Sequence, residues 1–158
     1  MKEIQLTRGQ VAIVDDGDYE WLNSYKWRAL WSSDTKSFYA TRTEYVDGKR
    51  CHIAMHRQIL GLTSSRIWGD HRNHDTLDYR RHNLRVSNRA QNASNSRLRR
   101  DNVSGLKGAH WHKRVKLYGA SITVNRKQLH LGYYPTAVEA HEAYKAAAAK
   151  YHGEFACA

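Results

Sequence analysis

The chain has 158 residues, 41% of them hydrophobic, and a formal net charge of +11 at pH 7. This length suits one medium-sized domain or two small ones. No apolar run approaches the roughly 20 residues that span a bilayer, and the first residues lack the apolar stretch of a signal peptide. We therefore expect a cytoplasmic protein without a membrane partner. The basic excess favours a polyanionic partner, usually nucleic acid.

The positive charge is unevenly distributed along the chain. Residues 1–65 contain nine lysines and arginines and eight acidic residues. Residues 66–103 contain nine basic and four acidic residues, and residues 104–158 contain eight basic and three acidic residues. The net charges are therefore +1, +5 and +5. This distribution predicts a binding surface in the middle and C-terminal segments.

Residues 1–65 have the pattern of a β-rich region. A short apolar strand is predicted at residues 11–14, and Asp47-Gly48 between two strand-like runs predicts a hairpin. A short helix is predicted at residues 56–62. Three tryptophans are expected to fill the core of this region: Trp21, Trp27 and Trp31.

Two short strands and a helix are predicted within residues 66–99. The first strand contains Asp70, the second begins at Asn83, and a polar loop separates them. Asn88 is suited to cap the helix that follows, and Gln91 completes a capping box. We expect this helix to run to about residue 99.

Residues 104–158 predict three strands followed by one helix. Apolar and polar side chains alternate over residues 118–124, which gives that strand one apolar face. Thr136 and Glu139 form a Thr-x-x-Glu capping box at the start of the helix.

A polar, turn-prone stretch at residues 101–105 predicts the domain boundary. We place one domain at residues 1–103 and the other at residues 104–158. The expected fold class is α+β. A β-rich N-terminal region leads into a strand–strand–helix motif, and a three-stranded antiparallel sheet packed on one helix follows.

The residues Asp70-His71, Asn83 and Asn92 resemble the motif of the HNH nuclease family, especially its phage and intron-encoded homing endonucleases. His71 and Asn83 are 12 positions apart, and Asn83 and Asn92 are 9 apart. The resemblance covers residues 55–99 and implies a ββα-metal fold. It also implies a divalent-metal-dependent DNA endonuclease, a site-specific nickase that hydrolyses phosphodiester bonds in a bacterial or phage-infected cell.

Phosphodiester hydrolysis needs an activated water and charge relief on the phosphate, and the motif offers groups for both. The imidazole of His71 suits the general base. By the resemblance, Asp70 and Asn92 hold Mg²⁺ or Mn²⁺ through oxygen atoms, and Asn83 holds the loop and orients the histidine. No Cys-x-x-Cys pair is present, so we expect no structural zinc. Three alternatives stay open: His74 or His82 as the base, and Asn95 as the ligand.

Residues 105–156 resemble the AP2 DNA-binding domain, most clearly at residues 105–111, 120–122, 130–134 and 136–140. This family lays its three-stranded sheet in the major groove and packs its helix behind. Several arginines of the family are histidine, serine or threonine here, so its GC-rich specificity is not expected to carry over. The candidate DNA contacts are Arg85, Arg89, Lys107, His110, His112, Arg114, Ser121, Thr123, Gln128 and His130. For Arg85 and Arg89 a simple solvated role stays open.

We expect double-stranded DNA as the partner, no small-molecule cofactor and a monomeric protein. Two other functions remain compatible with the sequence. One is a non-catalytic DNA-binding regulator that keeps a relic HNH fold. The other is a restriction or structure-selective nuclease that uses the same chemistry.

Overall fold

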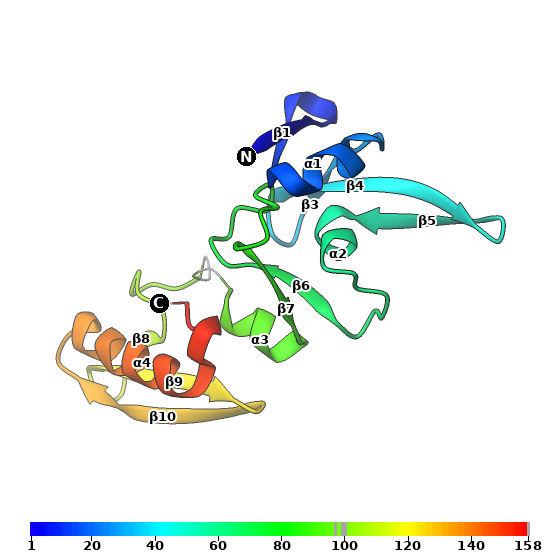
Figure 1. Ribbon diagram of the computed structural model, residues 1–158. Helices are drawn as coiled ribbons and strands as arrows, with labels where there is room; N and C mark the ends of the chain where they lie inside the picture. The colour runs from blue at the N-terminus through cyan, green and yellow to red at the C-terminus, as the bar shows by residue number, and fades with distance from the viewer. Residues whose placement is uncertain (97, 99–100, 158) are drawn as a thin grey trace. The chain divides into compact units, whose positions relative to one another are not determined.

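The chain forms two units, and the computed structural model describes residues 1–96, 98 and 101–157 (Figure 1). The N-terminal unit is Met1–Arg89 and the C-terminal unit is Ala90–Ala158. The division therefore lies within a helix, earlier than the linker predicted at residues 101–105. Both units combine helices with small antiparallel sheets, which confirms the α+β class. No helix in the described residues is both long and apolar enough to cross a membrane.

The N-terminal unit contains three small antiparallel sheets, with strand orders β1-β2, β3-β4-β5 and β6-β7. Its elements are β1 (Lys2–Gln5), a 3-10 turn (Thr7–Gly9), β2 (Val11–Val14), α1 (Asp16–Asn23), β3 (Arg28–Ser32), β4 (Ser37–Val46), β5 (Lys49–Ala54), α2 (Met55–Ile59), β6 (Trp68–His71) and β7 (Leu84–Ser87). The predicted strand, hairpin and short helix are confirmed. In the β4–β5 turn, Asp47 and Gly48 have φ angles of 50° and 72°, as a type I′ turn requires.

One apolar core holds the N-terminal unit together. Leu22, Trp27, Met55 and Tyr79 are buried in it. The prediction for Trp31 is wrong, because this side chain is 47% exposed and its ring packs edge-on against Phe38. Trp31 lies near the end of edge strand β3, beyond the buried part of that strand.

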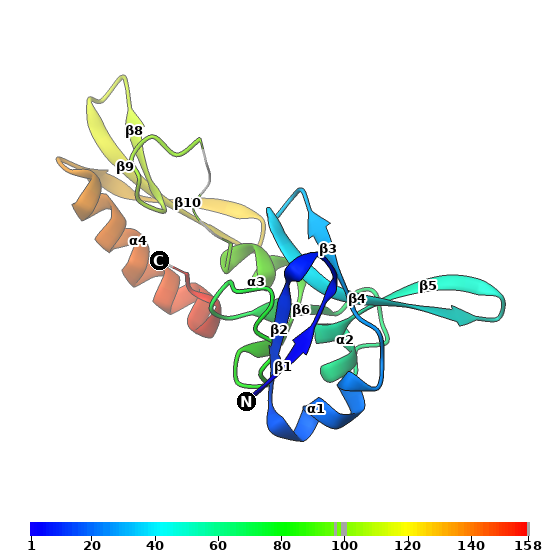
Figure 2. The ribbon, with the colours of Figure 1, turned by 90° about the horizontal axis from the view of Figure 1, so that it is seen from above.

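The C-terminal unit places helix α4 against one face of a three-stranded sheet (Figure 2). Its elements are α3 (Arg89–Ser94), whose first residue belongs to the other unit, β8 (Ala109–His112), β9 (Leu117–Val124), β10 (Lys127–Tyr134), α4 (Ala137–His152) and a 3-10 turn (Gly153–Phe155). Ile122 on β9 packs against Tyr144 and Ala148 of α4. The predicted three strands and capped helix are confirmed, since Thr136 Oγ1 accepts a hydrogen bond of 3.2 Å from the Glu139 amide.

Helix α3 begins directly after Asn88, as predicted, but it ends at Ser94 rather than near residue 99. The ammonium group of Lys107 donates to the carbonyl oxygens of Ser94 and Ser96, at 2.9 and 2.6 Å. These contacts satisfy backbone acceptors where the helix stops, which is the role of a C-terminal cap. The arginines at 97, 99 and 100, which were expected in the last turn of a longer helix, lie outside the described residues.

Candidate active site and nucleic-acid interface

Asp70 and His71 are the last two residues of strand β6, and β7 fixes their positions. Asp70 is in register with Arg85, and His71 with Leu84. The Arg85 guanidinium reaches Asp70 Oδ2 through both Nε and Nη2, each at 2.7 Å. Arg85 is only 6% exposed and binds Asp70, so its guanidinium is poorly placed to contact a DNA phosphate.

Aromatic rings surround the imidazole of His71. The ring centroids of Tyr79, His56 and Tyr39 lie 5.3, 5.5 and 6.1 Å from that of His71. Burial lowers the pKa of His71 to about 4, although the charge of Asp78 raises it. The ring is therefore neutral at pH 7 and can accept a proton. With this pKa it is a weaker base than an ordinary histidine.

His56 is a site residue for which the sequence pattern predicted no role. Its ring fills the space beside Gly69, where an added Cβ would come within 2.5 Å of His56 Cδ2. Burial, followed by the influence of His71 and Arg57, lowers the pKa of His56 to about 3. Its Nδ1 atom is buried and has no hydrogen-bond partner among the described residues. Met55-His56-Arg57 resembles the family's approach to the HNH motif, which is the one sequence signal for this residue.

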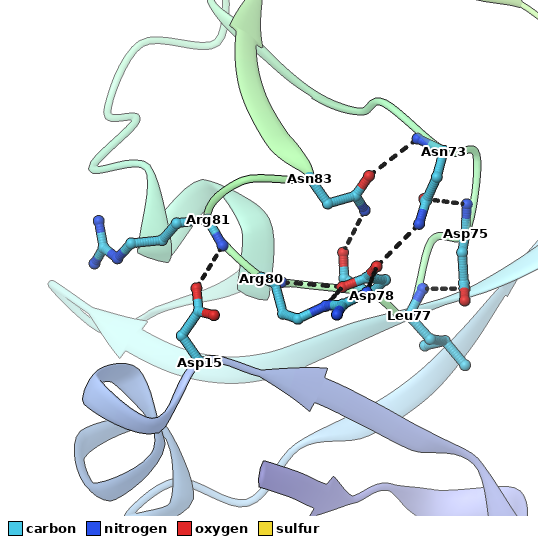
Figure 3. A network of polar contacts seen from close by, with 8 residues as sticks. All are labelled: Asp15, Asn73, Asp75, Leu77, Asp78, Arg80, Arg81 and Asn83. Carbon is cyan, nitrogen blue, oxygen red and sulfur yellow. Dashed lines mark hydrogen bonds and ion pairs between the residues drawn. The ribbon is translucent and has the colours of Figure 1, made fainter. Parts of the chain in front are cut away.

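Asn83 ties together the loop between β6 and β7 (Figure 3). Its Oδ1 accepts a hydrogen bond of 3.0 Å from the Asn73 amide, and its Nδ2 donates one of 2.8 Å to the Asp78 carbonyl. Asn83 is 2% exposed, so these are buried contacts. Asn83 therefore holds the loop together, whereas its role in orienting His71 stays a prediction.

Asp78 is the second buried residue whose hydrogen bonds hold this loop together. Arg80 donates to both carboxylate oxygens, at 2.8 and 2.7 Å, and Asn73 Nδ2 donates to Oδ2 at 2.9 Å (Figure 3). The hydrogen bonds from Arg80 hold the pKa of Asp78 below its usual value despite burial. The carboxylate is therefore charged and organises the loop at neutral pH.

The N-terminal strands and helix anchor the loop from outside. Tyr79 donates its amide to the Ile13 carbonyl at 2.8 Å, and Arg81 binds Asp15 and Asp18 with three bonds of 2.7 Å. The Tyr79 hydroxyl accepts from the Ala40 amide at 2.6 Å. Residues far apart in the sequence therefore hold the loop that follows His71 in one conformation.

The remaining predicted catalytic residues are divided between the two units. His74 and His82 lie on the β6–β7 loop, where His82 is exposed. Asp70 belongs to the N-terminal unit, whereas Asn92 and Asn95 belong to the C-terminal unit, so the predicted pairing of these ligands stays a prediction. Among the described residues no three His, Cys, Asp or Glu side chains gather as a metal site. The metal site predicted from the sequence is of another type, because its protein ligands are one carboxylate and one amide oxygen. Such oxygen donors suit Mg²⁺ or Mn²⁺.

The face of the β8–β9–β10 sheet opposite α4 carries most of the predicted DNA contacts. Ser121 and Thr123 alternate with the helix-facing residues of β9 and pair with His130 and Gln128 of β10. Gln128 Nε2 donates to Ser121 Oγ at 3.0 Å. His110 pairs with Gly119 on the same sheet. These five predicted contacts, which are His110, Ser121, Thr123, Gln128 and His130, therefore lie on one face of the sheet.

Tyr133 is a residue of this region that the sequence pattern did not indicate. It is 42% exposed, and its ring lies 5.1 Å from that of His112 and 4.5 Å from that of His130. The β-bulge between His130 and Gly132 changes the register just before Tyr133. Simple alternation along the strand therefore could not assign this residue to a face.

The predicted cations near the sheet have different environments. Arg114 is exposed in the β8–β9 turn, and Arg89 is exposed at the start of α3. Lys107 is partly buried against the backbone carbonyls that follow α3, and burial lowers its pKa. We therefore retain Arg89 and Arg114 as candidate phosphate contacts and assign Lys107 to the end of the helix.

Comparison with known proteins assigns no family to this chain. No family model matches it, and neither a curated protein nor a solved structure does so. Its function must therefore be argued from the residues and contacts described above.

Proposed function

We propose that this chain is a divalent-metal-dependent DNA endonuclease, a site-specific nickase of the homing type. The observation that carries the proposal is the environment of His71. A buried, neutral imidazole follows a carboxylate at the end of β6, rings surround it, and Asn83 and Asp78 hold the adjoining loop in place. Such preorganisation is what a general base requires.

In the proposed reaction His71 accepts a proton from a water molecule as the water oxygen attacks phosphorus. The new P–O bond forms while the bond to the 3′ oxygen breaks, and the electron pair leaves with that oxygen. Asp70 would be a carboxylate ligand of the cation, which when bound supplies positive charge to the phosphate and to the departing oxygen. Asn92 stays the second ligand predicted from the sequence. Arg85 keeps the Asp70 carboxylate in position, and Asn83 keeps the loop closed.

The C-terminal sheet is the proposed DNA reader. Its outer face presents hydroxyl, amide and imidazole groups, which can exchange hydrogen bonds with base edges in the major groove. Gln128 uses one amide hydrogen on Ser121. The second hydrogen and the carbonyl oxygen remain suited to an adenine, so we expect recognition that does not depend on GC-rich sequence.

A plasmid assay tests the nuclease proposal. Supercoiled plasmid carrying the genomic DNA that flanks the coding sequence is incubated with Mg²⁺ and wild-type protein, His71→Ala or His82→Ala. His82 is an exposed histidine of the same loop and an alternative candidate for the base, so it is tested in parallel. We expect nicked circles from wild type and His82→Ala, and a loss of about 10²–10⁴-fold in rate from His71→Ala with DNA affinity unchanged. Wild-type rates from His71→Ala would overturn the assignment of the base.

A non-catalytic DNA-binding regulator is the second candidate, and two observations favour it. The pKa of His71 is low for a base, and Arg85 neutralises the Asp70 carboxylate. The regulator would bind DNA equally well with and without Mg²⁺ and would leave every plasmid intact. A restriction or structure-selective nuclease would instead cut, and branched and linear substrates of one sequence would distinguish it from a site-specific enzyme.

A further inference from the structure

The hairpin of β4 and β5 extends beyond the sheet that supports it. Strand β3 pairs with β4 only over residues 37–41, whereas β4 continues to pair with β5 up to Val46 and Lys49. Residues 42–46 and 49–53 therefore form a two-stranded ribbon, which projects from the rest of the N-terminal unit in both views (Figures 1 and 2). The base of the ribbon is anchored to the unit, since Arg42 lies over the Tyr25 ring and its Nε donates to Gln58 at 2.8 Å. It is the tip of the ribbon that core packing does not explain.

The side chains at the tip of the ribbon face solvent. Tyr45 is 71% exposed and Val46 is 50% exposed. Opposite them, the side chains of Lys49 and Arg50 are exposed and make no hydrogen bond or ion pair within the described residues. By contrast, Arg42 and Glu44 at the base of the ribbon bind each other at 3.1 Å. Two exposed cations side by side favour an anionic partner.

We propose that this ribbon is a second DNA-contacting element, which enters the major groove of the duplex while Lys49 and Arg50 bind phosphates. This inference rests on the proposed function. Five residues per strand give a length of about 17 Å. The major groove is about 12 Å wide and 8.5 Å deep, and it admits a two-stranded β-ribbon. The one carboxylate of the tip, Asp47, occupies the turn position that requires positive φ.

The ribbon is connected to the candidate active site within the same unit. Strand β5 runs directly into α2, and His56 of α2 packs against Gly69, the residue before Asp70. DNA held by the ribbon would therefore be held in a fixed register relative to His71. The nuclease unit would then contribute its own affinity and help to set the position of the cut.

Salt-dependent binding by the full chain tests the ribbon. Lys49→Ala, Arg50→Ala and the double variant are compared with Lys26→Ala, an exposed lysine of the same unit between α1 and β3. Affinity for a short DNA duplex of mixed sequence is measured over a series of salt concentrations. Each lost phosphate contact should reduce the slope of log affinity against log salt by about 0.9. We expect a reduction of about 1.8 for the double variant and none for Lys26→Ala.

Two further readouts separate this inference from the nuclease proposal. Methylation of guanine N7 places a methyl group in the major groove, so it should weaken wild-type binding if the ribbon enters that groove, and equal binding of methylated and unmethylated duplex would overturn the groove contact. An unchanged slope in the double variant, with nicking by wild type, would overturn the ribbon alone. A reduced slope without any wild-type nicking would support the ribbon and overturn the nuclease. Thermal unfolding of each variant checks that these exposed substitutions leave the fold intact.

Discussion

The imidazole rings of His56 and His71 pack edge to face, with centroids 5.5 Å apart and an interplanar angle of 72°. One ring comes from α2 and the other from β6, and they meet beside Gly69, which leaves room for His56. Burial lowers the pKa of both histidines, so both rings are neutral at pH 7. His56 therefore supports the candidate base without placing a positive charge beside it.

Gly69→Ala should disturb this packing. The added Cβ would come within 2.5 Å of the His56 ring, and overpacking of this kind typically lowers the free energy of unfolding by about 1–3 kcal/mol. We expect a lower stability in urea and slower plasmid nicking. Gly17→Ala is the control, because a Cβ there meets nothing within 4 Å and lies in helix α1. This second change should be neutral or slightly stabilising, and equal destabilisation by both would contradict the steric argument.

His56→Phe should change the dependence of stability on pH. The folded pKa of about 3 lies below the ordinary value of about 6.5. Between these values the unfolded chain binds the proton, so the free energy of unfolding decreases as pH falls below about 6.5. Removing the imidazole should flatten this decrease by up to about 1.4 kcal/mol per pH unit. Urea unfolding between about pH 6.5 and 5 measures the slope, and an unchanged slope in His56→Phe would contradict this argument.

Asn83→Ala should loosen the β6–β7 loop. The substitution leaves the Asn73 amide and the Asp78 carbonyl without the buried partner that they now have. Each such loss typically costs about 1–3 kcal/mol, so we expect a decrease of about 2–4 kcal/mol in the free energy of unfolding. Asn23→Ala, an exposed position at the end of α1, should stay within about 0.5 kcal/mol of wild type. A stable Asn83→Ala variant would show that the loop does not depend on this side chain.

Chelation by EDTA should stop nicking without unfolding the protein. The chain has no Cys-x-x-Cys pair to form a thiolate site of the structural-zinc type. Activity should return when Mg²⁺ or Mn²⁺ is added, while the melting temperature stays constant throughout. A large decrease in melting temperature on chelation would instead indicate a metal that the fold requires.

Much of the architecture could be predicted because its determinants are local. The Asp47-Gly48 turn needs only two residues that tolerate positive φ. The start of α4 needs only Thr136 and Glu139, three positions apart. The apolar face of β9 follows from alternation along a single strand, because successive side chains point to opposite sides of a sheet. The spacing of the candidate catalytic residues is likewise a property of the linear sequence.

The features that could not be predicted depend on contacts between distant residues. The exposure of Trp31 depended on where the core ends. The contact of Lys107 with the carbonyl of Ser94, at the end of α3, joins residues that are distant in the sequence. The pairing of Arg85 with Asp70 required the register of two strands, which the sequence does not state. The low pKa of His71 arises largely from burial among rings that include Tyr39 and Tyr79, one from another sheet and one from the loop. Turn types, helix caps and periodicity are encoded within a few neighbouring residues, whereas burial, long-range hydrogen bonds and charge environment exist only after the chain has folded.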